Sequence, residues 1–146
     1  LDTFETPGDA PGQTHLIVSA KLERELAEIT DPEEREMFLA DLGLTDSALD
    51  RVIKKTYQLM GLISFFTAGE DEVRAWALRK DSLAPIAAGV IHSDIQKGFI
   101  RAEVLGYEDF IKAGDFKKAK ELGLFRLEGK EYRVQDGDII EFRFNV

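Results

Sequence analysis

The spacing of the apolar residues changes part-way along the chain, and this change limits what the chain can fold into. In the first part, Leu22 and Leu26 begin a pattern that repeats at the i, i+4 and i+7 positions of a helix face. Near the end, apolar and polar residues alternate from Ile140 to Val146, which is typical of a strand with one buried face. We therefore expect an α+β protein with a mainly helical part, residues 1–61, and a strand-containing domain, residues 62–146.

The first part should begin with irregular chain. Residues 1–14 contain the pairs Pro7-Gly8 and Pro11-Gly12 and show almost no apolar periodicity, so we expect a loop there. Leu16–Val18 is a short apolar run rich in β-branched residues and predicts a strand. A tight turn and a first helix, ending near Ile29, should follow it.

Two further helices are expected before residue 62. The run Thr30-Asp31-Pro32-Glu33-Glu34 supplies a cap, a proline at the first helical position and early carboxylates, which together favour a helix start. This second helix should end near Gly43. A third helix should run from Thr45 to Gly61, with its apolar residues on one face. Those residues are Leu49, Val52, Ile53, Tyr57 and Met60.

The second part should contain two hairpins, a short helix and two further strands. The first hairpin should consist of Leu62–Thr67 and Glu72–Arg79 around the turn at 68–71, and a helix should follow over Ala84–His92. Next come a strand over Phe99–Gly106 and two short helical pieces within Tyr107–Gly123. A second hairpin of Leu124–Glu128 and Glu131–Val134 and a last strand should complete the domain. In the strand Phe99–Gly106 we expect Ile100, Ala102 and Val104 to face the core and Arg101, Glu103 and Leu105 to face solvent. In the last strand Ile140, Phe142, Phe144 and Val146 should share the core face.

Composition excludes several classes of site. The chain has no cysteine and two histidines, which rules out disulfides, thiolate zinc sites and cysteine nucleophiles and leaves little to bind a metal. No apolar run approaches the ~18 residues of a membrane span, and the start lacks the features of a secretory signal, so we expect a cytoplasmic protein without a membrane partner. The formal net charge is −9, and the excess of acid lies mainly in the first 62 residues. Contact with nucleic acid would therefore need a local basic patch in the second part.

Several spaced motifs in the second part stand in a characteristic order. They are Phe66-Thr67-Ala68-Gly69, Glu72-Val73-Arg74-Ala75-Trp76, Ala87-Ala88-Gly89-Val90-Ile91-His92, Lys97-Gly98-Phe99-Ile100-Arg101-Ala102-Glu103-Val104, Tyr107-Glu108-Asp109-Phe110, Asp136-Gly137-Asp138 and Phe142-Arg143-Phe144-Asn145-Val146. Together they resemble the C-terminal domain of the YchF, or Obg-like ATPase, family. The resemblance implies that residues 62–146 form a TGS domain with a ubiquitin-like β-grasp fold, which also fits the predicted order of elements. Residues 16–61 resemble the stretch that joins the end of the family's GTPase-type domain to the TGS domain.

One short motif in that stretch bears on nucleotide binding. Val18-Ser19-Ala20-Lys21 resembles the fifth GTPase motif, whose backbone approaches the nucleotide base, so Ser19, Ala20 and Lys21 are candidates for a remnant base-binding site. The resemblance implies that the intact protein is an ATPase or GTPase using ATP or GTP with Mg²⁺. The chain has no G-x-x-x-x-G-K-[ST] loop to hold phosphates, so we expect it to carry no cofactor and to be inactive by itself.

The basic residues of the second part are the strongest candidates for binding. Lys117, Lys118 and Lys120 should lie on one short helix, and Lys97 and Arg101 at a strand edge. Such groups bind RNA phosphates, although solvated lysines balanced by nearby acids are an equal alternative. TGS domains occur in tRNA ligases, translational GTPases and stringent-response enzymes, so the resemblance favours ribosome or RNA contact through this domain.

Other residues with reactive side chains favour structural roles. His92 is expected at a helix end, and His15 has no neighbour in sequence with which to share a metal. The acid pairs Glu33-Glu34, Glu108-Asp109 and Asp136/Asp138 are typical of helix starts and turns. Strand spacing favours core packing over base stacking for the aromatic residues Trp76, Phe65, Phe66, Phe99, Phe142 and Phe144. We therefore predict no catalytic and no metal-binding residue in this chain.

Two alternative functions remain open at this point. The chain could be an independent protein-interaction module, a β-grasp domain with an acidic helical arm that binds a protein partner and no nucleotide. It could also be a small stand-alone hydrolase, which turnover of nucleotides or simple esters would reveal. The leading hypothesis is the C-terminal portion of a YchF-like P-loop ATPase or GTPase that serves in binding and regulation.

Overall fold

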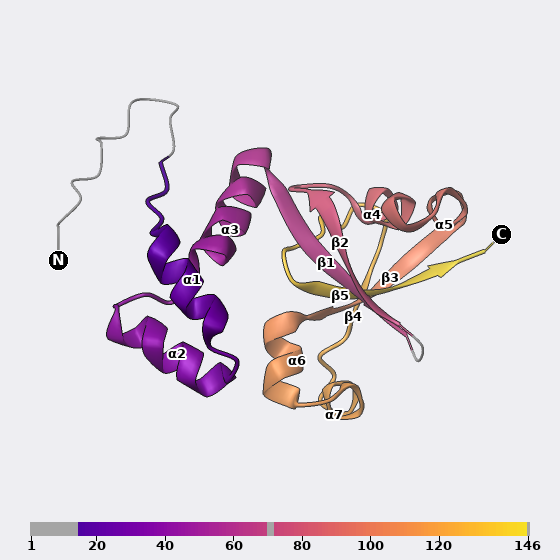
Figure 1. Ribbon diagram of the computed structural model, residues 1–146. Coiled ribbons are helices and arrows are strands. Elements are labelled where there is room, and N and C mark those ends of the chain that lie inside the picture. The colour runs from indigo at the N-terminus through magenta and orange to yellow at the C-terminus, as the bar shows by residue number, and fades with distance from the viewer. Residues whose placement is uncertain (1–14, 70–71, 146) are drawn as a thin grey trace. The chain divides into compact units, whose positions relative to one another are not determined.

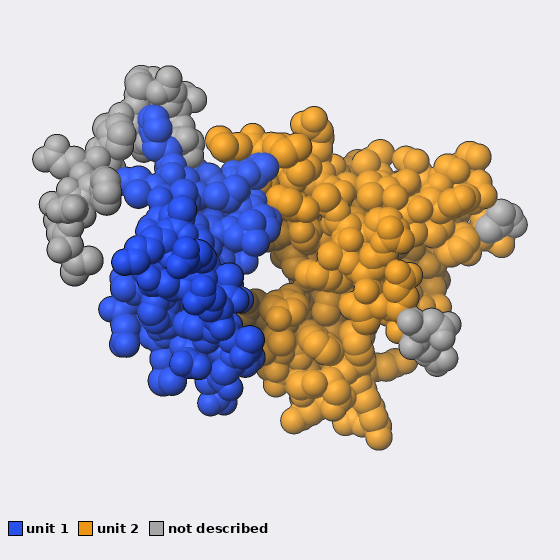
Figure 2. All heavy atoms as spheres, viewed as in Figure 1, with its two compact units in different colours: residues 1–56 blue, residues 57–146 orange. Residues whose placement is uncertain are grey.

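The computed structural model describes residues 15–69 and 72–145. Within them the chain forms two compact units, residues 1–56 and residues 57–146, which are coloured separately in Figure 2. The division falls inside a helix, five residues before the predicted domain boundary at 61/62, which stays a prediction. The loop expected over residues 1–14, the centre of the first predicted turn and Val146 lie outside the described residues.

The first unit contains the predicted helices. They are α1 (Ala20–Glu28), α2 (Pro32–Asp41) and α3 (Ala48–Met60), whose last turn belongs to the second unit. Asp31 caps α2 as expected, because its carboxylate accepts hydrogen bonds from the backbone N–H groups of Glu33 and Glu34 at 2.9 and 3.0 Å. Gly43, with a φ of 68°, follows the end of α2 in the left-handed conformation that glycine favours.

The strand predicted at Leu16–Val18 is wrong. These residues form no strand, and the side chains of Ile17 and Val18 are 41% and 49% exposed. A strand needs a neighbour to satisfy its backbone groups, and no strand of the described residues in the first unit can serve as one. This run therefore forms no strand, although its residues are apolar and partly β-branched.

The start of α3 is fixed by two hydrogen-bonding devices. Ser47 caps the helix, because its hydroxyl accepts from the Asp50 N–H at 3.1 Å and also donates to the Asp50 carboxylate at 2.6 Å. Glu23 of α1 accepts from the Ala48 N–H at 2.7 Å, which joins α1 to the beginning of α3. The apolar face predicted for α3 is largely exposed, with exposed fractions of 64% at Leu49 and 57% at Met60.

The second unit is built on one five-stranded mixed sheet with the strand order β2-β1-β5-β3-β4 (Figure 1). Its strands are β1 (Leu62–Ala68), β2 (Val73–Arg79), β3 (Phe99–Gly106), β4 (Arg126–Glu128) and β5 (Asp138–Phe144). The β1–β5 pair at the centre is parallel, and all other pairs are antiparallel. This order, with a helix lying across one face, is the β-grasp arrangement expected from the sequence.

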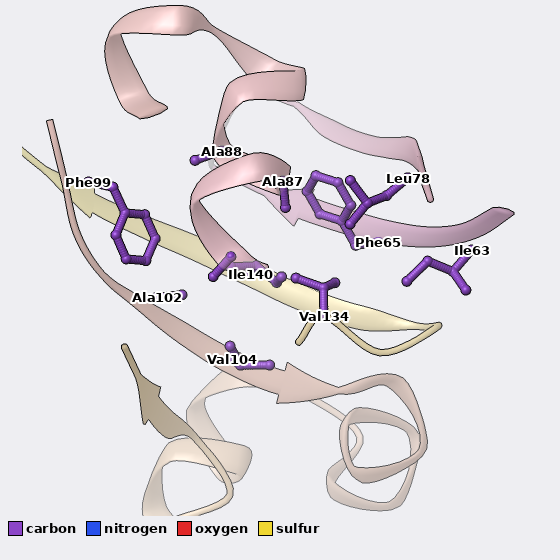
Figure 3. Close-up of a cluster of buried hydrophobic side chains, with 11 residues drawn as sticks. Ile63, Phe65, Leu78, Ala87, Ala88, Phe99, Ala102, Val104, Val134 and Ile140 are labelled. Carbon is purple, nitrogen blue, oxygen red and sulfur yellow. The ribbon is translucent and has the colours of Figure 1, made fainter. Parts of the chain in front are cut away.

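One face of the sheet is covered by α4 (Ala84–Ile91), and the short α5 (Ser93–Lys97) follows it. Ala84, Ala87 and Ala88 of α4 have no exposed surface, and their small side chains allow the helix to lie close to the sheet. Phe65 and Ile140 are among the large side chains that pack beneath them (Figure 3). The helix predicted at Ala84–His92 is thereby confirmed.

The strand β3 differs in part from its predicted pattern. Ala102 and Val104 are fully buried as expected, but Ile100 is 51% exposed and Phe99 is buried instead. The pairing of β3 with β5 shifts between Phe99 and Arg101, so Ile100 is the extra residue of a β-bulge and the alternation reverses there. Leu105, expected to face solvent, is also fully buried, because helices cover that end of the opposite face.

Those helices are α6 (Tyr107–Ala113) and α7 (Phe116–Glu121), which meet at Gly114 as predicted. Gly114 has a φ of 88°, a conformation that ends α6 and that other residues rarely adopt. Leu105, Ala113 and Ala119 form a second small core beneath the two helices. The sheet is therefore covered on both faces at this end.

The second predicted hairpin is wrong. Strand β4 pairs with β3, and residues 131–134 pair with the segment before α4, through a bridge between Leu83 and Arg133. The Val134 N–H donates to the Ser82 carbonyl at 3.0 Å, and the Val134 side chain is buried in the main core. Burial of Val134 draws this segment away from β4, so the two runs around Gly129 do not pair with each other.

We predict that Gly98→Ala destabilises the second unit by about 1–3 kcal/mol, because a β-carbon there would overlap the backbone oxygen of Asn145. The φ of −85° at Gly98 suits alanine, so the effect isolates this close approach. Urea denaturation would measure it. Gly129→Ala is the matched control, since a β-carbon at Gly129 meets nothing within 4 Å, and its stability should change by less than about 1 kcal/mol. Equal stability of the two variants would contradict this account.

We also predict that the excised fragment 62–146 folds alone, because the sheet and its two cores lie within it. Its thermal unfolding, followed by circular dichroism, should be cooperative. A gradual decline of the signal without a transition would show that the boundary lies elsewhere.

Candidate functional site

Three of the predicted binding residues lie together on α7. Asp115 caps this helix by accepting a hydrogen bond from the Lys118 N–H at 2.7 Å. Ala119 is buried against the sheet, which turns Lys117, Lys118 and Lys120 toward solvent. Within the described residues none of these three lysines forms an ion pair, so all three charges are available to an external anion.

Arg101 lies on the sheet face that α7 partly covers. It stands opposite Arg143 of β5, which forms ion pairs with Glu103 at 3.1 Å and Glu141 at 3.0 Å. The hydrogen bond to Glu103, followed by the charge of Glu141, raises the pKa of Arg143 above its ordinary value. Both nearby acids are thus engaged by Arg143, while Arg101 has no acidic partner among the residues that the structure describes.

Lys97 is separated from the α7 lysines. It ends α5, just before the start of β3, and pairs with Asp94 at 3.5 Å. The core beneath α7 contacts β3 at Leu105, and at ~3.3 Å per residue Arg101 lies roughly 13 Å from that point along the strand. The five candidates therefore form two groups, one on α7 and one near the beginning of β3.

The acids of the Asp136-Gly137-Asp138 motif are bound within the fold. Asp136 accepts from the Ser64 N–H at 2.8 Å, and the Gly137 N–H donates to the Ser64 carbonyl at 2.8 Å. Asp138 is 2% exposed and accepts from the Tyr132 hydroxyl at 2.7 Å and the Gln135 N–H at 2.8 Å. These contacts attach β5 to β1 and to the preceding loop, so the two carboxylates are held by structural bonds.

Tyr132 is coupled to this arrangement. Burial, and then the hydrogen bond and charge of Asp138, raise the pKa of the Tyr132 hydroxyl above its ordinary value. The neutral phenol is therefore the form that the fold favours, and it serves as a permanent donor to Asp138.

The remaining candidate residues have local roles. The His92 Nδ1 accepts from the Asp94 N–H at 3.2 Å and so caps α5. Ser19 caps α1 by accepting from the Leu22 N–H at 3.4 Å, Ala20 is the first residue of that helix, and Lys21 is exposed beside Glu25 at 3.9 Å. Within the described residues there is no group of three or more side chains that could hold a metal ion, and no helix that is long and apolar enough to cross a membrane.

An apolar hollow in the second unit was not predicted. It has a volume of about 260 Å³ and lies between the sheet and the helices α6 and α7. Its lining consists of Phe66, Ala68, Val73, Tyr107, Phe110, Phe116 and Ile139. The sequence holds one sign of it: Phe65 and Phe66 are adjacent in a strand, so one of them must face away from the main core.

Comparison with known proteins gives a consistent result. The family YchF-GTPase_C, described as a protein of unknown function, matches residues 62–145. The "Ribosome-binding ATPase YchF" of Haemophilus influenzae is 55% identical over 146 residues, all of this chain and 40% of that protein. That of Bacillus subtilis is 56% identical over 131 residues, 90% of this chain and 36% of that protein. "Obg-like ATPase 1" of Homo sapiens is 48% identical over 136 residues, 93% of this chain and 34% of that protein.

A solved structure agrees with these matches. The YchF GTPase of Schizosaccharomyces pombe superposes with a TM-score of 0.76 at 36% identity, over 92% of this chain and 35% of that one. The chain thus spans about 40% or less of the length of the relatives it matches, in their C-terminal part. With the family match, the sequence identities and the shared fold in agreement, the chain belongs to the YchF family of ATPases and GTPases.

Proposed function

We propose that the chain is the binding and regulatory C-terminal portion of a YchF-type ATPase or GTPase, and that residues 62–146 act as a TGS module that contacts the ribosome or its RNA in the cytoplasm. The relatives that align over the whole chain are named ribosome-binding ATPases, which supports this direction. The single observation that carries the proposal is the group of solvent-facing lysines on α7, with Arg101 on the same face of the sheet.

The electrostatics of the second unit suit a local rather than a general attraction to phosphate. The chain as a whole is acidic, with a formal net charge of −9, so it repels polyanions at a distance. Lysines that pair with no carboxylate of the described residues can still replace counterions on an RNA backbone once they are in contact. We therefore propose that the α7 lysines and Arg101 strengthen the contact with RNA, and that the fold of this domain and the rest of the protein set its orientation.

Nucleotide hydrolysis is proposed to need the rest of the protein. Triphosphate binding requires a Gly-rich loop, a lysine and a Mg²⁺ ligand, and no such loop occurs in the sequence. Ser19 is engaged in capping α1, and Lys21 lies beside Glu25, so these residues do not fit a phosphate chain. ATP or GTP with Mg²⁺ would be held elsewhere in the intact protein, with Ser19, Ala20 and Lys21 near the base at most.

A second candidate function is protein binding by the β-grasp unit. The observation that favours it is the apolar hollow between the sheet and the helices α6 and α7, with Val73 at 72% exposure on its wall. Such a hollow suits an apolar side chain of a partner. The acidic helices of the first unit are another candidate protein-binding surface, on which apolar residues of α3 such as Leu49 and Ile53 are exposed.

We predict that the chain binds neither ATP nor GTP with measurable affinity in the presence of Mg²⁺. Isothermal titration calorimetry should show only heats of dilution, because the sequence lacks the Gly-rich loop with its lysine that holds a triphosphate. A full-length member of the family serves as the positive control. Saturable binding with micromolar affinity would contradict the assignment of Ser19, Ala20 and Lys21 as a remnant site.

We predict that replacing Lys97, Arg101, Lys117, Lys118 and Lys120 with Gln leaves the melting temperature nearly unchanged, since exposed charges contribute about 0–1 kcal/mol each. Binding of the chain to purified ribosomes should weaken. Its dependence on salt should also become shallower, by about 1 in the slope of log K against log salt for each phosphate that the variant no longer binds. Co-sedimentation at several salt concentrations measures both effects.

The matched control replaces five basic residues of the first unit, Lys21, Arg24, Arg35, Lys54 and Lys55, with Gln. It changes the net charge by the same amount, so equal weakening by both variants would indicate a general charge effect. If the first variant melts normally and co-sediments as well as the unchanged chain, the basic residues are not the contact, and the apolar hollow becomes the next surface to test.

A further inference from the structure

Strand β2 is an open edge of the sheet. Among the described strands it pairs only with β1, through seven residue pairs in regular register from Val73 to Arg79. Natural edge strands are usually protected by prolines, bulges or charged residues, because an unprotected edge can pair with another chain. β2 contains no proline and no register shift. Its charged residues are Arg74 and Arg79, while Ala75 and Ala77 between them have small exposed side chains.

The hydrogen bonds at both ends of β2 show which backbone groups are free. The Lys80 N–H donates to the Gly61 carbonyl at 2.8 Å, and the Gly69 N–H donates to the Glu72 carbonyl at 2.9 Å. In an antiparallel ladder, alternate residues direct both backbone groups to the same neighbour. The even-numbered residues of β2 therefore bind β1, and the N–H and C=O groups of Val73, Ala75, Ala77 and Arg79 point away from the sheet.

We propose that β2 is a self-association edge, on which β2 of a second copy of this chain pairs antiparallel about a two-fold axis at Trp76. Trp76 is the midpoint of the strand, so this register pairs the whole of Val73–Arg79 with its own copy. Ala75 then stands opposite Ala77 of the partner subunit, and both are among the residues whose backbone groups point outward. The two sheets would become one continuous sheet.

The charges along β2 suit this occupant. Glu72 precedes the strand and Lys80 follows it, so the antiparallel register sets each Lys80 against Glu72 of the partner subunit. Arg74 meets Leu78 and Arg79 meets Val73, so no like charges are opposed within the strand pair. By contrast, a register centred on Ala77 opposes Arg74 to Lys80, and one centred on Arg74 opposes two copies of that arginine.

Trp76 gives the pairing an aromatic centre and a probe. Its indole N–H donates to the Thr67 hydroxyl at 3.0 Å, and the Arg74 guanidinium lies 4.2 Å from the ring centroid, so the ring is held in place before association. At the two-fold axis it would stand opposite Trp76 of the partner subunit. It is the single tryptophan of the chain, so its fluorescence reports on this edge without a label.

The association should be weak, since a pair of strands without further packing is marginally stable in water. We expect a dissociation constant of roughly 0.1–1 mM, observable by sedimentation equilibrium and by a concentration-dependent change in Trp76 fluorescence. Ala75→Pro removes an outward N–H that β1 does not use, and should weaken dimerisation at least about tenfold. Ala75→Ser keeps that N–H and should dimerise like the unchanged chain.

Charge exchange tests the register without proline. In the Glu72→Lys variant, a lysine at position 72 faces Lys80 of the partner subunit at both ends of the strand pair. In the Lys80→Glu variant, a glutamate at position 80 faces Glu72 of the partner subunit at both ends. Each variant alone should stay monomeric at concentrations where the unchanged chain dimerises. An equimolar mixture of the two should dimerise again, because unlike charges then meet at both ends.

Three results would overturn the proposal: an unchanged chain that remains monomeric to ~1 mM, a dimer that Ala75→Pro does not weaken, or a mixture of charge variants that does not associate. If the chain stayed monomeric under all these conditions, the β2 edge would be assigned instead to pairing with a strand of a different protein. Circular dichroism of each variant verifies that its fold is kept.

Discussion

The parallel pairing of β1 with β5 is the contact on which the rest of the second unit depends. It sets Phe66 opposite Ile139, and beside it the Ser64 N–H donates to the carboxylate of Asp136, 72 residues away in sequence. Without it the β1–β2 hairpin would have no link to the pair β3–β5, and α4 would have half a sheet to pack on. The Asp136-Gly137-Asp138 motif, which carries part of the family resemblance, therefore holds the centre of the sheet together through hydrogen bonds.

The two faces of the sheet differ in how fully they are covered, and this difference places the candidate binding residues. The alanine-rich α4 closes one face with side chains small enough for close contact. On the other face α6 and α7 cover only the end near Leu105, which leaves Arg101, Glu103, Glu141 and Arg143 on the open remainder. Arg143 pairs with both glutamates, so Arg101 has no ion-pair partner among the described residues, and the two arginines and two glutamates together make this uncovered surface neutral in a chain that is acidic overall.

Much of this arrangement follows from the sequence, and the exceptions have physical causes. Helix starts at Asp31 and stops at Gly114 follow from local backbone chemistry, so spacing and caps predicted them correctly. The exposure of Ile100 results from a β-bulge, and the pairing of the segment around Val134 results from competition between strand partners. Neither can be predicted from the local sequence pattern. Leu16–Val18 needs a strand neighbour that a local pattern cannot supply. Of the candidate site, residue types and exposure could be predicted, whereas the separation of Lys97 from α7 required the register of β3.

The central position of β5 also has a consequence for how the chain acquires its structure. β5 is the last strand in chain order, yet it occupies the middle of the sheet. During synthesis the β1–β2 hairpin and strand β3 are made before β5, so the edges that will pair with β5 stay unpaired until it is made. Pairing β1 with β5 closes the long loop of chain between them, which is entropically slow. We expect the domain to assemble late, after its final strand has left the ribosome, and to depend until then on protection of those exposed edges.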